Sequence, residues 1–261
     1  MFDYHIHSRI SFDSKEEPFD IAQTAKANGL REICFTDHYD FHSDKNGKHM
    51  LFKKEDYDEA YGALALDGLK IKRGVEFGLT TWNAPELSAL NKEYNFDYVI
   101  GSVHFVDGYD PYVKEYWLGK SEKEAFYRYL EHTLDCVRAH TEFDVLGHLN
   151  YVCKSPNNPN RAPLIYSDYK DISDEIMAEL ARRGKGLEIN TSGFDRVGHP
   201  LPNKDFLLRF KELGGEIVTV GSDAHNLTRV GQYVPKALEI LKDVFGYVCT
   251  FENRKPIFNK L

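Results

Sequence analysis

The sequence predicts an α/β fold in which short parallel strands close into a single barrel. The chain has 261 residues, a normal length for one α/β barrel. Seven short runs of strand-forming residues are each followed by a segment with helical spacing, and this alternation is typical of a parallel sheet. Residues that can bind metal ions stand at the ends of most runs. We therefore expect residues 1–261 to form one domain around one core.

The predicted strands are short and apolar, and each ends in a polar or glycine-containing segment. In a parallel barrel the carboxyl ends of all strands open on one face, so side chains there meet in space although they are distant in sequence. The predicted strands are Phe2–His5, Glu32–Thr36, Ile71–Glu76, Tyr98–Val103, Val145–His148, Leu187–Asn190 and Ile217–Gly221.

Helix start and stop signals separate these strands. Pro18 suits the first position of a helix that ends at Gly29, and Ser121 with Glu124 forms a capping box at the start of another helix. Apolar residues at helical spacing indicate faces that pack on the core. Three later stripes of this kind end at Gly184, Gly214 and Gly246.

The composition disfavours several classes of partner. Lys and Arg number 33 against 41 Asp and Glu, a net charge of -8, and no basic run could follow a nucleic-acid backbone. No segment approaches about 18 consecutive apolar residues, and the N-terminus lacks the features of a signal peptide. The four scattered cysteines favour reduced core thiols. We expect a cytoplasmic protein that binds neither nucleic acid nor membranes; its oligomeric state stays open.

The first predicted strand ends in His5-Ile6-His7. Residues two apart on a strand project to the same side, so both imidazoles can reach one ion. Taken alone this pattern is weak, because each histidine could be a hydrogen-bonded core residue. Similar residues end most other strands, and their convergence on one face predicts a metal site. The further candidates are His38, Glu76, His104, His148, Asp223 and His225.

Several polar residues have a weaker claim to this site. Asp37 stands beside His38, where a carboxylate often orients a ligating histidine or caps a helix. His132 and His140 lie inside a predicted helix and near its end, so we expect both to be solvated. Leu187–Asn190 is the one predicted strand without an obvious ligand at its end.

The candidate ligands are imidazoles and carboxylates without thiolates. This chemistry suits zinc, manganese or iron in a hydrolytic site and argues against a structural zinc held by cysteines. A carboxylate such as Glu76 can bridge two ions. Two cations about 3.5–4 Å apart would lower the pKa of a shared water and stabilise displacement at phosphorus. We therefore expect a pair of divalent metal ions and a phosphate ester substrate.

The pattern of H-x-H, D-H, a lone Glu, two separate His and a final D-x-H resembles the polymerase-and-histidinol-phosphatase (PHP) family. The match runs from His5 to His225, in order. Gly186–Thr191 and Gly221–His225 further resemble the histidinol-phosphate phosphatase branch. The resemblance implies a distorted (β/α)7 TIM-like barrel with its metal site at the C-terminal face of the strands.

The resemblance also implies how the ligands are shared among three metals. The first metal would take His5, His7, Glu76 and Asp223, and Glu76 would bridge to a second metal held by His104 and His148. A third metal would take Asp13, His38 and His225. Asp13 occupies a position that is histidine in many relatives, which puts the identity and affinity of the third ion in doubt.

Three basic residues are candidate contacts for the substrate phosphate. Arg161 lies in the loop Ser155–Pro163, which is rich in Pro and Asn, and Arg196 follows the sixth predicted strand. Guanidinium groups suit phosphoryl oxygens, although surface salt bridges are the alternative for both. His42, four residues after His38, is the third candidate, with a solvated loop histidine as its alternative.

The expected reaction is hydrolysis of L-histidinol phosphate to L-histidinol and inorganic phosphate in histidine biosynthesis, by attack of a metal-activated hydroxide on phosphorus. Asp223 or His225 is a candidate to protonate the departing oxygen, and a water bound to metal is an equal candidate. The first alternative is a PHP enzyme that acts on another small phosphomonoester or phosphodiester. An amidohydrolase and a non-catalytic metal-binding PHP domain are weaker alternatives.

Overall fold

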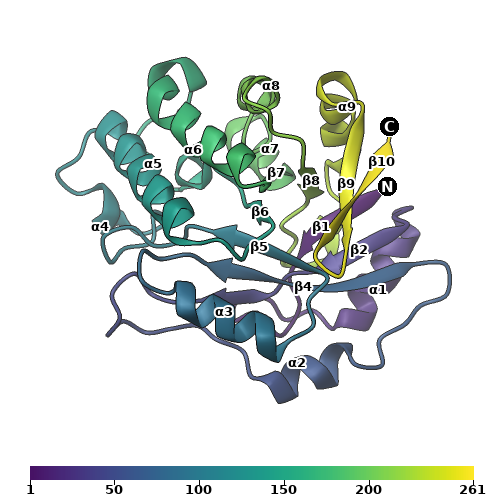
Figure 1. The fold of residues 1–261 in the computed structure, drawn as a ribbon. Coiled ribbons are helices and arrows are strands. Elements are labelled where there is room, and N and C mark those ends of the chain that lie inside the picture. The colour runs from purple at the N-terminus through teal and green to yellow at the C-terminus, as the bar shows by residue number, and fades with distance from the viewer.

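The computed structural model describes residues 1–261 and confirms the predicted α/β barrel (Figure 1). Parallel strands form a nearly closed sheet in the order β1-β2-β4-β5-β6-β7-β8, and the short β3 pairs with β4. The strands of this sheet are β1 (Phe2–Ile6), β2 (Glu32–Phe35), β3 (His38–Asp40), β4 (Lys70–Gly78), β5 (Tyr98–Ser102), β6 (Val145–Leu146), β7 (Gly186–Asn190) and β8 (Val218–Gly221). An antiparallel hairpin follows, made of β9 (Tyr247–Glu252) and β10 (Lys255–Lys260).

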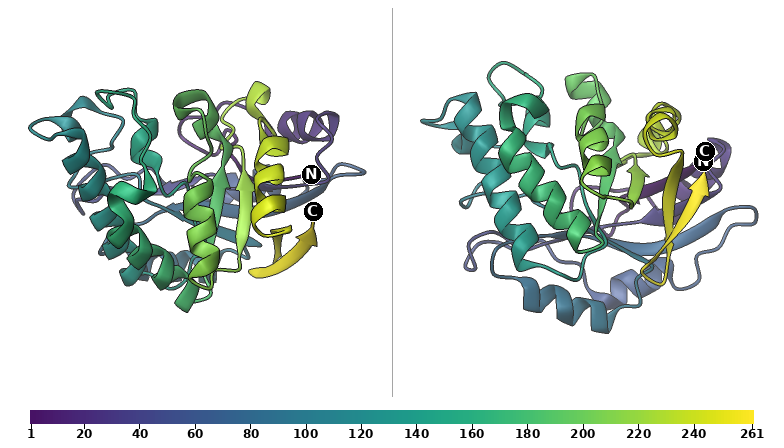
Figure 2. Two further views of the ribbon diagram at one scale, coloured as in Figure 1. Left: turned by 90° about the horizontal axis from the view of Figure 1, so that it is seen from above. Right: turned by 45° about the horizontal axis from the view of Figure 1, so that its top comes forward.

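Helices cover the outside of the barrel. One side of the barrel is covered by α5, α6, α8 and α9, and another side by α1, α2 and α3 (Figures 1 and 2). No helix combines the length and the apolar character needed to cross a membrane. The helices are α1 (Pro18–Ala27), α2 (Lys54–Tyr61), α3 (Ala84–Glu93), α4 (Lys114–Trp117), α5 (Glu122–Ala139), α6 (Lys170–Arg182), α7 (Phe194–Val197), α8 (Lys204–Glu212) and α9 (Val234–Val244).

The barrel closes where β8 meets β1. Ile6 and Ala224 form a parallel bridge, and the amide of His7 donates to the carbonyl of Ala224 over 2.9 Å. The amide of Asp223 likewise donates to the carbonyl of His5 over 2.8 Å. Closure therefore places the first and the last metal-binding motifs of the sequence side by side.

The seven predicted strands and five predicted helices are present, with ends shifted by a few residues. Pro18 begins α1, and the Ser121–Glu124 capping box begins α5. The sequence does not predict β3, which is too short to show alternation, or the polar helix α2, which buries only Tyr57 and Tyr61. It also misses α3 and the hairpin β9–β10.

The expectation of solvated histidines in α5 is wrong. His132 is 7% exposed and His140 is 1% exposed. Nε2 of His140 lies 2.9 Å from the carbonyl oxygen of Thr80, so this histidine ties the end of α5 to the segment after β4. Tertiary packing on both sides of α5 buries residues that the sequence pattern alone leaves outside.

The hairpin β9–β10 fills the amino end of the barrel. Phe251 on β9 packs with Tyr4, Tyr98 and Cys249 in a buried cluster that is separate from the main core. The amide of Phe251 donates to the hydroxyl of Tyr4 over 3.0 Å, and this hydroxyl donates to the buried Glu32. The barrel is thus closed by side chains at the end opposite the strand carboxyl ends.

All four cysteines are buried and free.

Arg254 fixes the turn of this hairpin to the barrel. Its guanidinium donates to the carboxylate of Asp144, to Oδ1 of Asn91 over 3.1 Å and to the carbonyl of Glu142. Asn253 and Arg254 both have positive φ, 49° and 64°, in a turn where glycine is the favoured second residue. The side-chain contacts of Arg254 therefore offset a strained backbone conformation.

Arg254→Ala should lower the free energy of unfolding by about 1–3 kcal/mol, because Asp144 loses its charged partner while the turn stays strained. Urea titration followed by circular dichroism measures this change. Arg182→Ala removes an exposed arginine that pairs with Glu179 within one helix, and should leave the same quantity almost unchanged. Equal effects of the two substitutions would show that Arg254 does not anchor the hairpin.

Candidate metal centre

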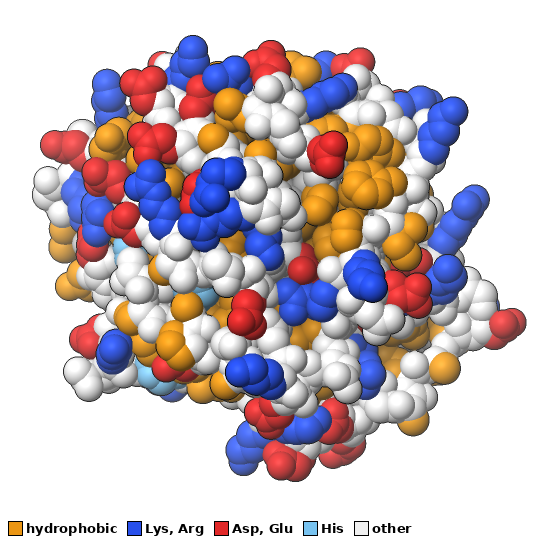
Figure 3. All heavy atoms as spheres, viewed as in Figure 1, with side chains coloured by type: hydrophobic (Ala, Val, Ile, Leu, Met, Phe, Trp, Pro, Cys, Tyr) orange, Lys and Arg blue, Asp and Glu red, His pale blue; other side chains and the backbone are white.

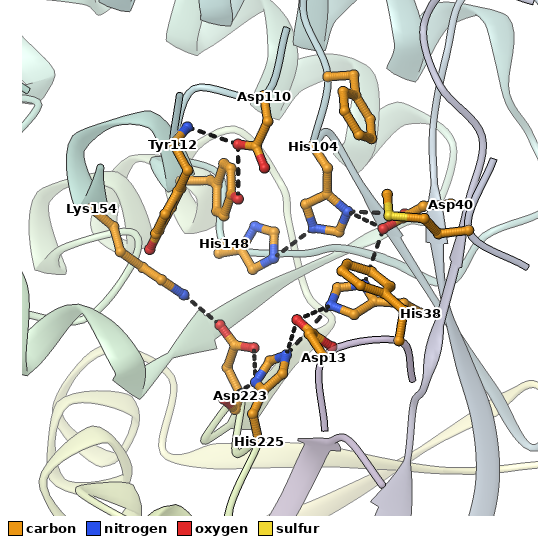
Figure 4. A pocket seen from close by; sticks show the side chains of 14 residues that line it. Asp13, His38, Asp40, His104, Asp110, Tyr112, His148, Lys154, Asp223 and His225 are labelled. Carbon is orange, nitrogen blue, oxygen red and sulfur yellow. Dashed lines mark hydrogen bonds and ion pairs between the residues drawn. The ribbon is translucent and has the colours of Figure 1, made fainter. Parts of the chain in front are cut away.

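Six of the nine candidate ligands line one cavity of about 420 Å³ at the carboxyl ends of the strands, namely Asp13, His38, His104, His148, Asp223 and His225. The other three, His5, His7 and Glu76, are fully buried and contact these residues. Strand register brings them together: His38 on β3 pairs with Glu76 on β4, and β4 also pairs with β2 and β5. Figure 4 shows His38, His104, His148, Asp223 and His225 directed toward the same space. The structure brings all nine predicted ligands into three adjoining groups.

The first group surrounds one oxygen of Glu76. Nε2 of His5 and Nε2 of His7 lie 3.2 Å and 3.5 Å from Glu76 Oε2. Both nitrogens lie 3.5–3.7 Å from Asp223 Oδ1. Both nitrogens and Glu76 Oε2 are buried without a hydrogen-bond partner. Four ligand atoms that face one another, three of them without a hydrogen bond, fit a cation between them.

The spacing in the first group is compatible with ligand atoms that bind one metal ion. Zn²⁺ bound at about 2.1 Å from each of four ligand atoms would hold these atoms about 3.4 Å apart. The observed separations between His5 or His7 and the two carboxylates run from 3.2 to 3.7 Å. An isolated hydrogen-bond network would instead bring nitrogen and oxygen to about 2.9 Å.

The second group surrounds the other oxygen of Glu76. Oε1 lies 2.8 Å from Nε2 of His148 and 3.3 Å from Nε2 of His104. The two imidazole nitrogens are 3.5 Å apart. Oε1 also accepts a hydrogen bond from Ser102 Oγ over 2.7 Å, which fixes the plane of the carboxylate. Glu76 is therefore placed to join the first and second groups, as predicted.

The third group is the most exposed. Nε2 of His225 lies 3.4 Å from Nε2 of His38 and 3.1 Å from Asp13 Oδ2, and the distance from His38 to Asp13 is 3.6 Å. His7 stacks on both of these imidazoles, with ring centroids 4.0 Å from His225 and 4.3 Å from His38. Asp13 thus occupies a position from which a carboxylate can bind the same ion as the two histidines.

The electrostatics of the site favour cations. Burial lowers the pKa of His5 and His104, but neighbouring carboxylates outweigh burial and raise both pKa values well above their usual range. The pKa of His38 rises to about 9, because Glu76 and Asp40 outweigh the effect of burial. Burial raises the pKa of Glu76, but the surrounding imidazoles reverse this and hold it well below its usual range. A metal cation would be attracted by the same carboxylates.

Two inward-facing residues of β7 complete the site, although the sequence shows no ligand at the end of this strand. Glu188 Oε1 lies 2.6 Å from His5 Nδ1, and Glu188 Oε2 accepts the amide of His148 over 2.9 Å. Asn190 donates to Glu188 Oε2 over 3.2 Å. Glu188 thereby keeps a proton on His5 Nδ1 and leaves Nε2 free for a metal. The two-residue alternation that identifies His5 and His7 could have identified this pair.

Asp37 shapes the loop that carries Asp13. Its carboxylate accepts from the amides of Ser8 and Ser11 over 2.7 and 3.2 Å and from the hydroxyl of Tyr61. It contacts no candidate metal ligand directly through its side chain. This position agrees with the expectation that Asp37 is less favoured than His38 as a metal ligand.

Lys154 is a candidate functional residue that no sequence motif indicates. Its ammonium donates to Asp223 Oδ2 over 2.6 Å and to Ser192 Oγ over 2.9 Å, and its side chain is 14% exposed. Figure 4 shows it reaching Asp223 from across the cavity. Burial raises the pKa of Asp223, but Lys154 and His5 outweigh burial and hold it well below its usual range. One oxygen of Asp223 thus faces the first group and the other faces a lysine.

The predicted phosphate contacts lie beside the cavity. Arg161 and Arg196 line a smaller hollow of about 70 Å³, and Lys154 lines both this hollow and the main cavity. His42 is farther away: its Nδ1 accepts the amide of Asp44 over 3.1 Å, and its ring lies 4.7 Å from that of Phe105, which lines the cavity. The structure brings the two arginines to one place and keeps His42 behind Phe105.

Comparison with known proteins supports the PHP family, which the sequence motifs resemble. The chain is 34% identical over 263 residues to the histidinol-phosphatase of Lactococcus lactis, covering 99% of this chain and 97% of that protein. It is 30% identical to a probable histidinol-phosphatase of Clostridium acetobutylicum, with 99% and 96% coverage.

A solved structure shows the same similarity in three dimensions. It is the histidinol phosphate phosphatase of Lactococcus lactis in complex with zinc, L-histidinol and phosphate, with a TM-score of 0.89, 33% identity and 98% coverage of both chains. The family model described as PHP domain matches residues 3–192. The ordered motifs, the barrel and these matches agree, and the chain belongs to the PHP family.

Proposed function

We propose that the protein is a metal-dependent histidinol-phosphatase that hydrolyses L-histidinol phosphate to L-histidinol and inorganic phosphate in histidine biosynthesis. The observation that carries the proposal is the cluster of nine imidazole and carboxylate side chains, six of which line one cavity, in a chain that aligns end to end with a histidinol-phosphatase. Another small phosphate ester is the alternative substrate, because a metal cage binds the phosphoryl group and contacts little of the leaving group.

The three groups would hold two to three divalent ions of zinc, manganese or iron. His5, His7, Glu76 and Asp223 would hold the first ion, while the second would bind Glu76, His104 and His148. The third would bind Asp13, His38 and His225, and its occupancy depends on the exposed carboxylate of Asp13, 36% exposed. Such ions would lower the pKa of water and balance the charge of the phosphoryl oxygens.

The residues of the chain would bind and orient the ester. Lys154 lines the cavity, and Arg161 and Arg196 line the smaller hollow beside it, so the three cations would receive phosphoryl oxygens at this side of the cavity. Phe12, Met50 and Phe105 line the cavity and would exclude water from the leaving group. His42 would act only through Phe105, since it does not line the cavity.

The surface charges and the free thiols bear on two further parts of the proposal, the small substrate and the reducing compartment. On the face shown in Figure 3, acidic and basic side chains are interspersed. The four buried free cysteines agree with a cytoplasmic location. We propose that residues 1–261 act as a single domain; the partner is then a small phosphate ester.

The purified protein should release phosphate from L-histidinol phosphate much faster than from other alkyl phosphates under one metal condition. Incubation with a chelator should abolish turnover, and added Zn²⁺, Mn²⁺ or Fe²⁺ should restore it. Glu76→Gln should lower kcat by more than about 100-fold, because the bridging charge is lost from both groups. Glu252→Gln, on the exposed end of β9, is the control. Comparable rates with all esters would favour the alternative substrate, and bound metal without turnover would favour a non-catalytic domain.

Arg161→Met and Arg196→Met should each raise KM for the phosphate ester about 10- to 100-fold, because each removes charge-assisted hydrogen bonds to phosphate. Steady-state kinetics and the inhibition constant of inorganic phosphate measure this effect. Arg182→Met, in which an exposed arginine of α6 is lost, should leave both constants unchanged. If the arginines served only in surface salt bridges, all three variants would behave alike.

Asp223→Asn should slow hydrolysis of L-histidinol phosphate and of p-nitrophenyl phosphate by the same factor. The physical reason is that Lys154 keeps Asp223 ionised, so that it serves as a ligand and holds no proton to donate. A proton donor matters only for the poor alkyl leaving group, where it contributes about 10²–10⁴-fold. Selective loss with the alkyl ester would make Asp223 the donor, and the same pattern in His225→Gln would assign that role to His225.

A further inference from the structure

Asp40, the last residue of β3, lies between two of the metal-binding groups. Its Oδ1 is 3.0 Å from Nδ1 of His104, and its Oδ2 is 3.2 Å from Nδ1 of His38, a nitrogen that also lies 3.1 Å from Glu76 Oε2. His104 belongs to the second group and His38 to the third. One carboxylate therefore contacts an imidazole from each of two groups, and Figure 4 shows it beside both rings.

Both imidazoles present their other nitrogen to a candidate metal position. Nε2 of His104 lies 3.3 Å from Glu76 Oε1, and Nε2 of His38 lies 3.4 Å from Nε2 of His225. A neutral imidazole binds metal through the nitrogen that carries no proton. A carboxylate beside Nδ1 keeps the proton there and leaves Nε2 free, so Asp40 favours the ligating tautomer of both rings.

The surroundings of Asp40 hold its carboxylate in this position. Asp40 is 1% exposed, so protein atoms surround most of its carboxylate. Gly78 lies opposite Asp40 in the register of β3 and β4, and a Cβ atom on Gly78 would overlap Asp40 Oδ1. The missing side chain at Gly78 makes room for the carboxylate between the two strands.

We propose that Asp40 is a positioning residue that couples the second and third metal sites by fixing the tautomers of His104 and His38. The inference rests on the proposed function, since it requires metal ions in both groups. His38, Asp40 and His104 also lie close enough together to bind an ion themselves, which is the rival role for Asp40. The coupling role predicts that loss of one carboxylate weakens two ions that it does not bind.

Metal affinity measured without turnover tests this coupling. Wild type, Asp40→Ala and Asp40→Asn are titrated with Zn²⁺ against a chromogenic chelator, and the bound metal is counted by elemental analysis. Asp40→Ala should weaken two ions by about 10- to 100-fold each. Asp40→Asn keeps one acceptor oxygen and should weaken only one of them. Asp13→Ala, which removes a donor of the third group alone, should weaken one ion.

Two further variants make the result decisive. Asp110→Asn is the matched control, because Asp110 lines the same cavity but accepts hydrogen bonds from Tyr112 and Tyr151 and from no candidate ligand. Its metal affinities should equal those of wild type. Gly78→Ala pushes on the Asp40 carboxylate from the opposite strand and should reproduce the two-ion loss. If circular dichroism shows that Asp40→Ala does not fold, Gly78→Ala is used in its place.

The possible outcomes separate this inference from the proposed function. Unchanged affinities in the Asp40 and Gly78 variants, with wild type still binding metal and hydrolysing the ester, would overturn the coupling alone. Complete loss of one ion in both Asp40 variants, with the others unchanged, would make Asp40 a ligand and also overturn it. A wild-type protein that binds no metal would overturn both proposals.

Discussion

The site depends on one fully buried carboxylate, Glu76, which must be balanced by positive charge on both of its oxygens. Oε2 faces His5 and His7, and Oε1 faces His104 and His148. An ionised carboxylate without partners in the interior would cost several kcal/mol. β4 is hydrogen-bonded to β2, β3 and β5, so Glu76 cannot move out to water without breaking the sheet. The imidazoles and the ions that they would hold follow from this placement.

Barrel closure supplies the remaining partners. The last strand of the barrel returns to the first, and the amide of Asp223 bonds to the carbonyl of His5. This contact holds the Asp223 carboxylate opposite Glu76, with His5 and His7 between them. Gly221 precedes this segment, and a Cβ there would overlap both His5 and Glu188. Close approach of β8 to β1 therefore depends on a glycine at the point of contact.

The sequence predicts the barrel and the nine converging residues because both depend on local rules. Strand alternation places His5 and His7 on one side, and parallel strands bring their carboxyl ends together. The same rules do not predict Asp40, because β3 is only three residues long. They also do not predict Lys154, which reaches Asp223 from the end of a four-residue 3-10 helix, Tyr151–Lys154. The metal groups are predictable from residue type at strand ends, whereas the residues that orient them depend on tertiary contacts.

The two ends of the barrel are built from different chemistry, and this difference directs access to the site. At the amino end, Phe251, Tyr4 and Tyr98 fill the interior, and the hairpin is anchored there through Arg254. Polar donors are concentrated at the carboxyl end, where the cavity opens among Phe12, Asp13 and Tyr112. Because close-packed side chains block the amino end, a charged ester can approach the donors only from the cavity.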